Sequence, residues 1–504
     1  MERYCEFLKK GLRRGTGCDT ISAMNVYGET EMTQKRMICV GILLSAAVLL
    51  SACGKKPETP KVPETTESVT AAPPSAPAPA PETGTEDPID YEALAKLPFA
   101  ELKESAEADF TVTEDADGVT VTAYVGSDER VRIPDRIGGK PVAAIADGAF
   151  RDCTGIKVLW IPDSVTKFGS DILVGATSLY ALHTPIPTEE GKRFLGWLFG
   201  AKSWELNNTR DLRHVDFLEI GGTATELPDH ALFDCNDLVT VSLPETMTEI
   251  GNWSFARCAS LKRIDLSRVT LVGEGALLGC SALSEVNLSA LERIGREALG
   301  NCNGLRRLIL PFAGESRTEN RFLGWLFGAR TAETSEGLYP GGLREVILTD
   351  GTVSLADYAF YAATMRSVTV GTGATEVGVR AFGNCANLRE VTLPAGIAAV
   401  REHAFSGCTA LAELTLPSGV TELGINTFLG CTALECVTLP ETLEILPNGA
   451  FLGCRRLKTV DLGGVREVGA DAFRGCVALE TVRTVGKVSF AEGNDRAAAL
   501  VGGN

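Results

Sequence analysis

Three consecutive stretches of the chain repeat one pattern. Residues 388–410 read LREVTLPAGIAAVREHAFSGCTA, residues 411–433 read LAELTLPSGVTELGINTFLGCTA, and residues 434–454 read LECVTLPETLEILPNGAFLGC. Leu, Pro, Phe and Cys keep fixed places at a period of 22 to 23 residues, while the other positions vary. A fixed period of this size indicates a solenoid and lies in the range of leucine-rich repeats.

Each copy has three parts with different backbone requirements. In the first part, Val391 and Leu393 alternate with polar residues, which predicts a strand with these two side chains turned inward and a Pro after it that ends the hydrogen bonding. The second part ends in a glycine such as Gly424, which we expect to allow a turn. In the third part, the spacing of Phe405 and Cys408 places both on one face of a single helical turn. Because one unit cannot bury its apolar side alone, we predict an α/β-type leucine-rich-repeat solenoid of stacked 22–23-residue units, with a parallel β-sheet on the concave face and short helical turns and irregular segments elsewhere.

Ten of the 15 cysteines occupy one position of the repeat, and two further copies have alanine there. Alanine can replace a small buried thiol but not a disulfide partner or a metal ligand, so we favour inert, buried cysteines over a metal or redox array. The cysteines of this column are Cys153, Cys235, Cys258, Cys280, Cys302, Cys385, Cys408, Cys431, Cys454 and Cys476, and the alanines are Ala176 and Ala363.

The repeats have a specific family resemblance. The segments IPDSVTKFG, LPSGVTELGINTFLGC and LPETLEILPNGAFLGC resemble the BspA-like leucine-rich repeats of bacterial surface proteins, and the resemblance covers roughly residues 109–485. The segment before the first copy resembles the lead-in that often opens such arrays, and its Asp117-Gly118 predicts a hairpin turn. The chain departs from the pattern where leucine replaces the Phe, at Leu232, Leu277 and Leu299. The resemblance implies adhesion to host matrix proteins and other cells.

The first part of the chain contains, in sequence order, the features of an export signal and of a tether. Residues 32–53 combine a basic start, a short apolar run and Leu-Ser-Ala-Cys, which resembles the lipobox of bacterial lipoproteins and implies that Cys53 carries the lipid. We interpret residues 1–31 as a non-native extension before this signal. Residues 54–90 are rich in Pro, Thr and Glu and predict a disordered stalk, and residues 91–108 predict a short helix.

Two similar insertions interrupt the array, which we expect to consist of a lead-in cap at 109–148, repeats at 149–485 and a tail at 486–504. RFLGWLFGAK begins at Arg193 and RFLGWLFGAR at Arg321, within insertions that we place at 186–211 and 312–342. Their apolar residues either pack back onto the solenoid as enlarged units or form paired knobs that contact a ligand.

No catalytic or metal-binding motif is found in the sequence. GxSxG, P-loop, HExxH and CxxC patterns do not occur, and the acidic residues are dispersed, so we expect neither an enzyme nor a cofactor, a metal or a small-molecule substrate. His183, His214 and Asp216 fall at outward strand positions, but the long insertion between these strands argues against a shared metal site. The net charge of −17 argues against nucleic acid as a partner.

The outward strand positions remain as the candidate binding face. Arg263, Glu285, Arg307 and Glu345 alternate in charge on successive copies, which indicates either a solvated ladder of ion pairs or a polar recognition stripe. The candidate residues are Trp160, His183, His214, Asp216, Arg263, Asp265, Glu285, Asn287, Arg307, Glu345, Glu390 and Thr392, with Trp160 as the strongest single anchor. We expect an exported, lipid-anchored protein that faces outside the cell and binds protein or glycan macromolecules in adhesion. The alternative is an envelope-structural or glycan-binding lipoprotein without an adhesive role.

Overall fold

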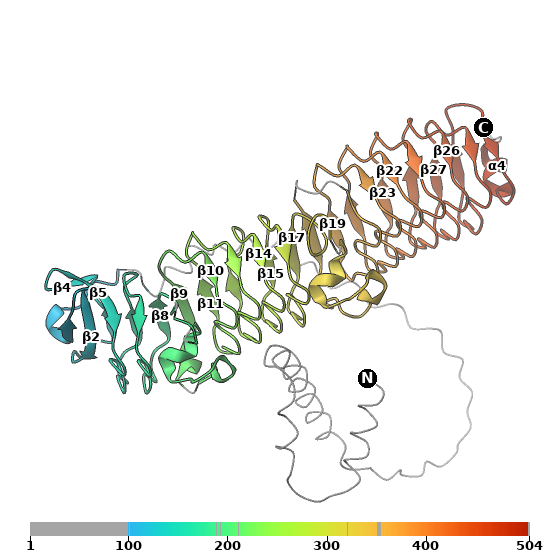
Figure 1. Cartoon of the computed structure of the whole chain (residues 1–504). Coiled ribbons are helices and arrows are strands. Elements are labelled where there is room, and N and C mark those ends of the chain that lie inside the picture. Colours follow the sequence, from blue (N-terminus) through green and yellow to red (C-terminus); the bar gives the residue numbers. More distant parts are fainter. Residues whose placement is uncertain are drawn as a thin grey trace, which may run out of the picture. The chain divides into compact units, whose positions relative to one another are not determined.

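The computed structural model describes residue 99 and residues 101–187, 189–191, 193–209, 211–319, 321–349 and 354–501. The expected extension (1–31), lipoprotein signal (32–53) with Cys53, and stalk (54–90) lie outside the described residues, as does most of the segment 91–108. From residue 101 onward the chain winds through stacked rungs that follow one another in sequence order (Figure 1). This parallel-strand solenoid confirms the predicted leucine-rich-repeat fold.

Each rung contributes one strand to a first ladder, in which neighbouring strands are parallel. The ladder divides into three sheets, because β13 is not hydrogen-bonded to β15 nor β21 to β23. Its strands are β3 (Arg130–Arg132), β6 (Val158–Trp160), β8 (Ala181–Thr184), β9 (Phe217–Ile220), β11 (Thr240–Ser242), β13 (Arg263–Ile264), β15 (Glu285–Asn287), β17 (Arg307–Leu310), β18 (Glu345–Leu348), β19 (Ser367–Thr369), β21 (Glu390–Thr392), β23 (Glu413–Thr415), β25 (Cys436–Thr438), β27 (Thr459–Asp461) and β29 (Thr481–Arg483).

A second ladder of two-residue strands runs along the same rungs. Its strands are β7 (Lys167–Phe168), β10 (Glu226–Leu227), β12 (Glu249–Ile250), β14 (Leu271–Val272), β16 (Arg293–Ile294), β20 (Glu376–Val377), β22 (Ala399–Val400), β24 (Glu422–Leu423), β26 (Ile445–Leu446), β28 (Glu467–Val468) and β30 (Ser489–Phe490). The second residue of nearly every strand points into the core, as Ile250 and Leu446 do.

The glycine after these strands has a different role from the one predicted. Gly424 does not adopt a positive φ. It is required because a Cβ there would overlap the backbone nitrogen of Glu402 on the preceding rung. The left-handed positions lie instead in the following turn, at Asn426 (φ 57°) and Gly430 (φ 72°).

The turn between the two ladders forms the apolar spine of the solenoid. The rings of Phe360, Phe382, Phe405, Phe428, Phe451 and Phe473 stack on successive rungs, with centroids 5.0 to 5.6 Å apart and planes within 12° of parallel. All ten cysteines of the repeat column are free thiols, and all but the half-buried Cys153 are buried. The expectation of inert, unpaired cysteines is thus confirmed for the described residues.

The two ends of the array are built from segments outside the regular repeats. At the start, β1 (Phe110–Glu114) pairs antiparallel with β2 (Val119–Tyr124), β2 runs parallel to β5 (Lys140–Ile145), and β4 (Arg136–Ile137) pairs with β5. β3 and β5 then open the first and second ladders. At the other end, residues expected as a tail form β30 and the helix α4 (Asp495–Val501), and Asn494 donates to the carbonyl oxygen of Gly469.

Apart from α4, the described helices are short 3-10 segments. They are η1 (Glu107–Asp109), η2 (Leu195–Phe199), η3 (Trp204–Leu206), η4 (Leu212–His214), η5 (Leu323–Phe327) and η6 (Ala332–Ser335). The described end of the segment expected as a helix, 91–108, contains only the first two residues of η1.

Candidate binding face

The outward side chains of the first ladder form two columns, and the strand register fixes their neighbours. Glu285 lies opposite Arg307, and Arg307 lies opposite Glu345. In the adjacent column, Asn287 lies opposite Ile309, and Thr392 opposite Thr369. These are the neighbours that the repeat alignment predicts, so the candidate residues from β15 onward share one face.

The charge alternation in this column extends over three rungs. The Arg307 guanidinium lies 3.5 Å from the Glu285 carboxylate and 2.9 Å from that of Glu345. Both pairs are partly exposed, so each is worth only a few tenths of a kcal/mol. Among the described residues, no ion pair joins Arg263 to Glu285, and the β13 and β15 strands that carry them lie in different sheets. Asp265 lies just past the end of β13 and accepts a hydrogen bond from the backbone N–H of Ser267.

The prediction that His214 and Asp216 occupy outward strand positions is wrong. His214 ends the 3-10 helix η4, and the strand begins three residues later, with Phe217 opposite Ala181 and Glu219 opposite His183. The first apolar position of this copy is Val215 rather than leucine, and the preceding insertion removes the regular spacing that would have revealed the shift.

His183 does occupy the predicted outward strand position, opposite Trp160 and Glu219, but its side chain is not available for binding. His183 is only 2% exposed, because the indole of Trp160 stacks on its imidazole at 3.4 Å and Phe99 packs against both rings. The guanidinium of Arg132 lies 5.1 Å from the Trp160 ring centroid. Trp160 is therefore half-buried in an aromatic cluster near the start of the ladder rather than a free anchor.

Two ionisable groups in this cluster have shifted pKa values. Burial lowers the pKa of His183 to about 4, although the carboxylate of Asp163, 3.6 Å from its Nε2, acts in the opposite direction. Burial and then the charge of Asp163 raise the pKa of Glu219 to about 7. Sequence reasoning missed Phe99, Asp163 and Glu219. Of these three, only Glu219 could have been found from the sequence, because Val215 and Leu218 keep the spacing of the repeat and so fix the register of this strand.

A groove lies on the face at the second interruption of the first ladder, between β21 and β23. Glu390 and Thr392 on β21, with Glu413 and Thr415 on β23, line a groove of about 710 Å³. These four side chains are exposed, and the facing edges of β21 and β23 are not hydrogen-bonded to each other. The interruption therefore opens a groove lined by polar side chains, two of them at predicted positions.

The two insertions pack onto the turn side of the array. Leu195 donates its backbone N–H to the carbonyl oxygen of Ala231, and Leu198 accepts from the N–H of Leu173. In the second insertion, Leu323 and Leu326 bond in the same way to Ala359 and Leu299. Neighbouring regular turns are joined by the same backbone hydrogen bonds. Each insertion therefore adds one extra turn to this side of the array, while the first-ladder strands before and after it still pair directly, β8 with β9 and β17 with β18.

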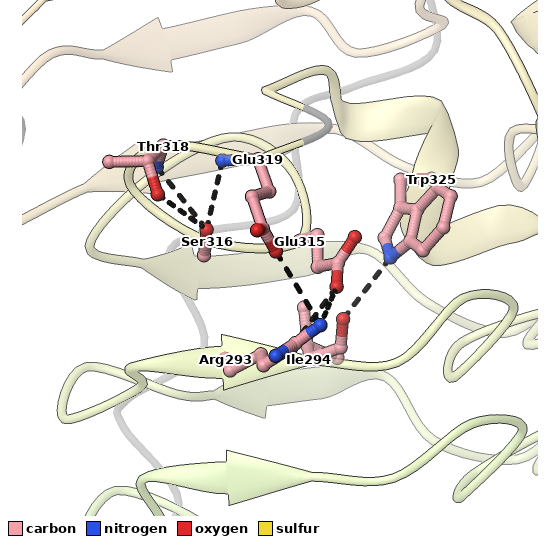
Figure 2. Close-up of polar contacts among 7 residues, drawn as sticks. All are labelled: Arg293, Ile294, Glu315, Ser316, Thr318, Glu319 and Trp325. Atoms are coloured by element: carbon pink, nitrogen blue, oxygen red, sulfur yellow. Dashed lines mark hydrogen bonds and ion pairs between the residues drawn. The ribbon is translucent and has the colours of Figure 1, made fainter.

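Each insertion also presents one tryptophan to the second ladder. Trp325 donates its indole N–H to the carbonyl oxygen of Ile294 at 3.1 Å, next to the Arg293 side chain, which pairs with Glu315 and Glu319 (Figure 2). Trp197 donates in the same way to Gly169 at 2.8 Å. Each tryptophan thus bonds to a rung whose second-ladder strand does not pair with the next strand of that ladder. β7 does not pair with β10, and β16 does not pair with β20.

Neither a cluster of metal ligands nor a membrane-spanning helix is found among the described residues. No group of three or more His, Cys, Asp or Glu side chains among them could hold a metal ion. None of the helices in this part of the chain is long and apolar enough to cross a bilayer.

Stacked rungs with parallel strands, a phenylalanine spine and an open strand face define a leucine-rich-repeat protein, a fold typical of binding proteins rather than enzymes. The chain belongs to the BspA type leucine rich repeat family, whose model matches residues 131–190, 208–323 and 344–489 in six copies. No curated protein matches the chain.

The chain is similar to several solved structures. A leucine-rich repeat protein from Bacteroides ovatus is 21% identical, with 76% of this chain and 98% of that one covered and a TM-score of 0.33. A leucine rich cell surface protein from Faecalibacterium prausnitzii is 20% identical, with 80% and 98% covered and a TM-score of 0.26. The pneumococcal vaccine antigen PcpA is 17% identical, with 77% and 95% covered and a TM-score of 0.25.

Proposed function

We propose that this chain is a lipid-anchored surface protein whose strand face binds protein partners in adhesion. The observation that carries the proposal is the groove between β21 and β23, where Glu390, Thr392, Glu413 and Thr415 surround unpaired strand edges. A side chain or loop of a partner can enter this groove, where the glutamates favour basic groups. The columns on either side widen the contact over many rungs, so no single residue is essential.

The test is binding of the purified chain to host extracellular-matrix proteins and, separately, to purified cell wall. Thr392→Trp fills the groove and is expected to weaken matrix binding by about tenfold or more. Thr438→Trp is the matched control, because Thr438 is exposed in the same column but does not line the groove. Equal loss in both variants would contradict the groove as the binding site. Binding to cell wall alone would contradict the adhesive role and favour an envelope-structural one.

The anchor is tested separately at Cys53. Cells that express the chain are labelled with a fatty-acid analogue, and the label is expected on the wild type but not on Cys53→Ala. Equal labelling of the two chains would refute the lipid anchor without affecting the proposal for the strand face.

A further inference from the structure

Four arginines occupy the same position on four successive rungs, immediately before the strands of the first ladder. They are Arg306, Arg344, Arg366 and Arg389, and all four are exposed. Their backbones form one continuous line, since Arg344 donates its N–H to Arg306, Arg366 to Arg344, and Arg389 to Arg366, at 2.7 to 2.8 Å. Neighbouring strands are about 4.8 Å apart, so this arginine row extends over about 14 Å.

The arginine row has no carboxylate partners among the described residues, in contrast to two lysines elsewhere in the same column. Elsewhere the same position holds Lys157, which pairs with Glu129 on the preceding rung at 2.7 Å, and Lys458, which pairs with Glu435 at 3.1 Å. Within the described part of the chain, no carboxylate lies within ion-pair distance of any arginine of the row. Four adjacent guanidinium groups repel one another, and on a chain of net charge −17 they form a local region of opposite sign.

Three of these arginines surround a polar pocket. Arg344, Arg366 and Arg389 line a volume of about 230 Å³ together with Thr364 and Asn387. The Thr364 hydroxyl donates to the carbonyl oxygen of Pro340 at 2.9 Å, which leaves its oxygen lone pairs free to accept from a ligand hydroxyl. The exposed Asn387 amide can donate and accept.

We propose that the arginine row is a binding site for a linear acidic glycan that carries sulfate or carboxylate groups. A guanidinium binds either group through two parallel N–H···O bonds, and a row of them selects a polymer with regularly spaced anions. The hydroxyl and amide groups of the pocket fit the sugar hydroxyls between those anions. None of the nine residues that line the pocket is aromatic, so it lacks the stacking platform that single-stranded nucleic acids require.

The site adjoins the strand face of the proposed function and shares Arg389 with its groove, whereas Arg344 and Arg366 line only the arginine pocket. It is tested on the full chain with four probes: heparin as a sulfated glycan, polygalacturonate as a carboxylated one, neutral dextran, and an oligothymidylate. We expect binding of one or both acidic glycans that weakens as salt is added, and no binding of dextran. Heparin and polygalacturonate separate the two anion chemistries.

Two sets of variants assign the binding to the row. Arg344→Ser/Arg366→Ser/Arg389→Ser is expected to reduce glycan affinity at least about tenfold without changing the melting temperature, since these side chains are exposed. The corresponding triple Arg→Lys variant keeps the charge but loses the planar fork and is expected to bind with intermediate affinity. Lys458→Ser is the matched control in the same column and is expected to bind as the wild type does.

Three results would overturn the proposal. The first is a folded triple Ser variant with wild-type affinity, and the second is a wild-type chain that binds neither acidic glycan. The third is an oligothymidylate bound as tightly as the glycans, which would show a general polyanion surface instead.

Discussion

The thiol of Cys408 donates a hydrogen bond to the carbonyl oxygen of Phe382 on the preceding rung, across 3.1 Å. The same bond recurs along the array, for instance from Cys431 to Phe405 and from Cys476 to Phe451. The phenylalanine whose ring stacks on the next rung therefore also accepts a bond from that rung's cysteine. Burial raises the pKa of these thiols, to about 12 for Cys431 and Cys476, so they remain protonated donors.

Cys408→Ala is expected to lower the free energy of unfolding by about 1–2 kcal/mol, because it removes both the buried sulfur and the hydrogen bond. Urea denaturation measures the change. Ala363 occupies the equivalent position naturally, so Ala363→Cys is the reverse test and should be neutral or stabilising. In the folded chain, iodoacetamide should label the exposed Cys436 while Cys408 stays protected. Rapid labelling of Cys408 would show that the column is not buried.

The phenylalanine stack predicts a graded response at one position. Phe405 lies between Phe382 and Phe428, with ring centroids 5.0 and 5.6 Å away. Phe405→Ala should destabilise the chain by about 3–5 kcal/mol because it leaves a cavity in the spine. Phe405→Leu should cost about 1–2 kcal/mol, since leucine already fills the equivalent position in other rungs. Equal effects of the two substitutions in urea denaturation would show that ring stacking, rather than filled volume, stabilises the spine.

The sequence predicted the fold and most of the strand register because copies of nearly equal length leave each side chain only one place in the stack. This reasoning succeeded at Arg307 and Glu345 even across the second insertion, since Leu343 and Val346 keep the repeat spacing there. It failed after the first insertion, where Val215 replaces the leucine that marks the start of a copy.

Contacts from outside the repeat could not be predicted from periodicity. The burial of His183 depends on Phe99, which precedes the array, and on the flat stacking of Trp160. The groove at Glu390 depends on an interruption of the first ladder for which the repeat sequence has no signal. The arginine row could have been recognised from sequence, since Arg306, Arg344, Arg366 and Arg389 hold one position in four successive copies.

The insertion tryptophans should contribute mainly to stability. Trp325→Phe keeps an aromatic ring but removes the N–H that bonds to Ile294, so it should lower the free energy of unfolding by about 1 kcal/mol. Trp197→Phe should have a similar effect through Gly169. Denaturation measures both, and binding to matrix proteins provides the second readout. Lost binding by either variant with unchanged stability would mean that the insertions are ligand contacts.

Glu219 should make the stability of the chain depend on pH. Its pKa is raised from 4.5 to about 7 in the folded chain, so folding favours the protonated carboxyl. The stability from this group is fully present below pH 4.5 and is lost as the pH rises through about 7. Glu219→Gln mimics the protonated form at every pH. The variant should therefore match the wild type near pH 4.5 and exceed it by about 2 kcal/mol at pH 8, a figure reduced for the partial exposure of the side chain.

The comparison isolates Glu219 because the other titrating groups are present in both chains. His183, with a pKa lowered to about 4, loses stability as the pH falls from 6.5 toward 4, which is the opposite direction. The contribution of His183 largely cancels when the unfolding free energy of the wild type is subtracted from that of the variant at each pH. Asp163→Asn removes the second cause of the Glu219 shift and should narrow the difference between the two forms of residue 219. A difference in unfolding free energy that stays constant from pH 4.5 to 8 would show that Glu219 is ionised normally and that the aromatic cluster is open to water.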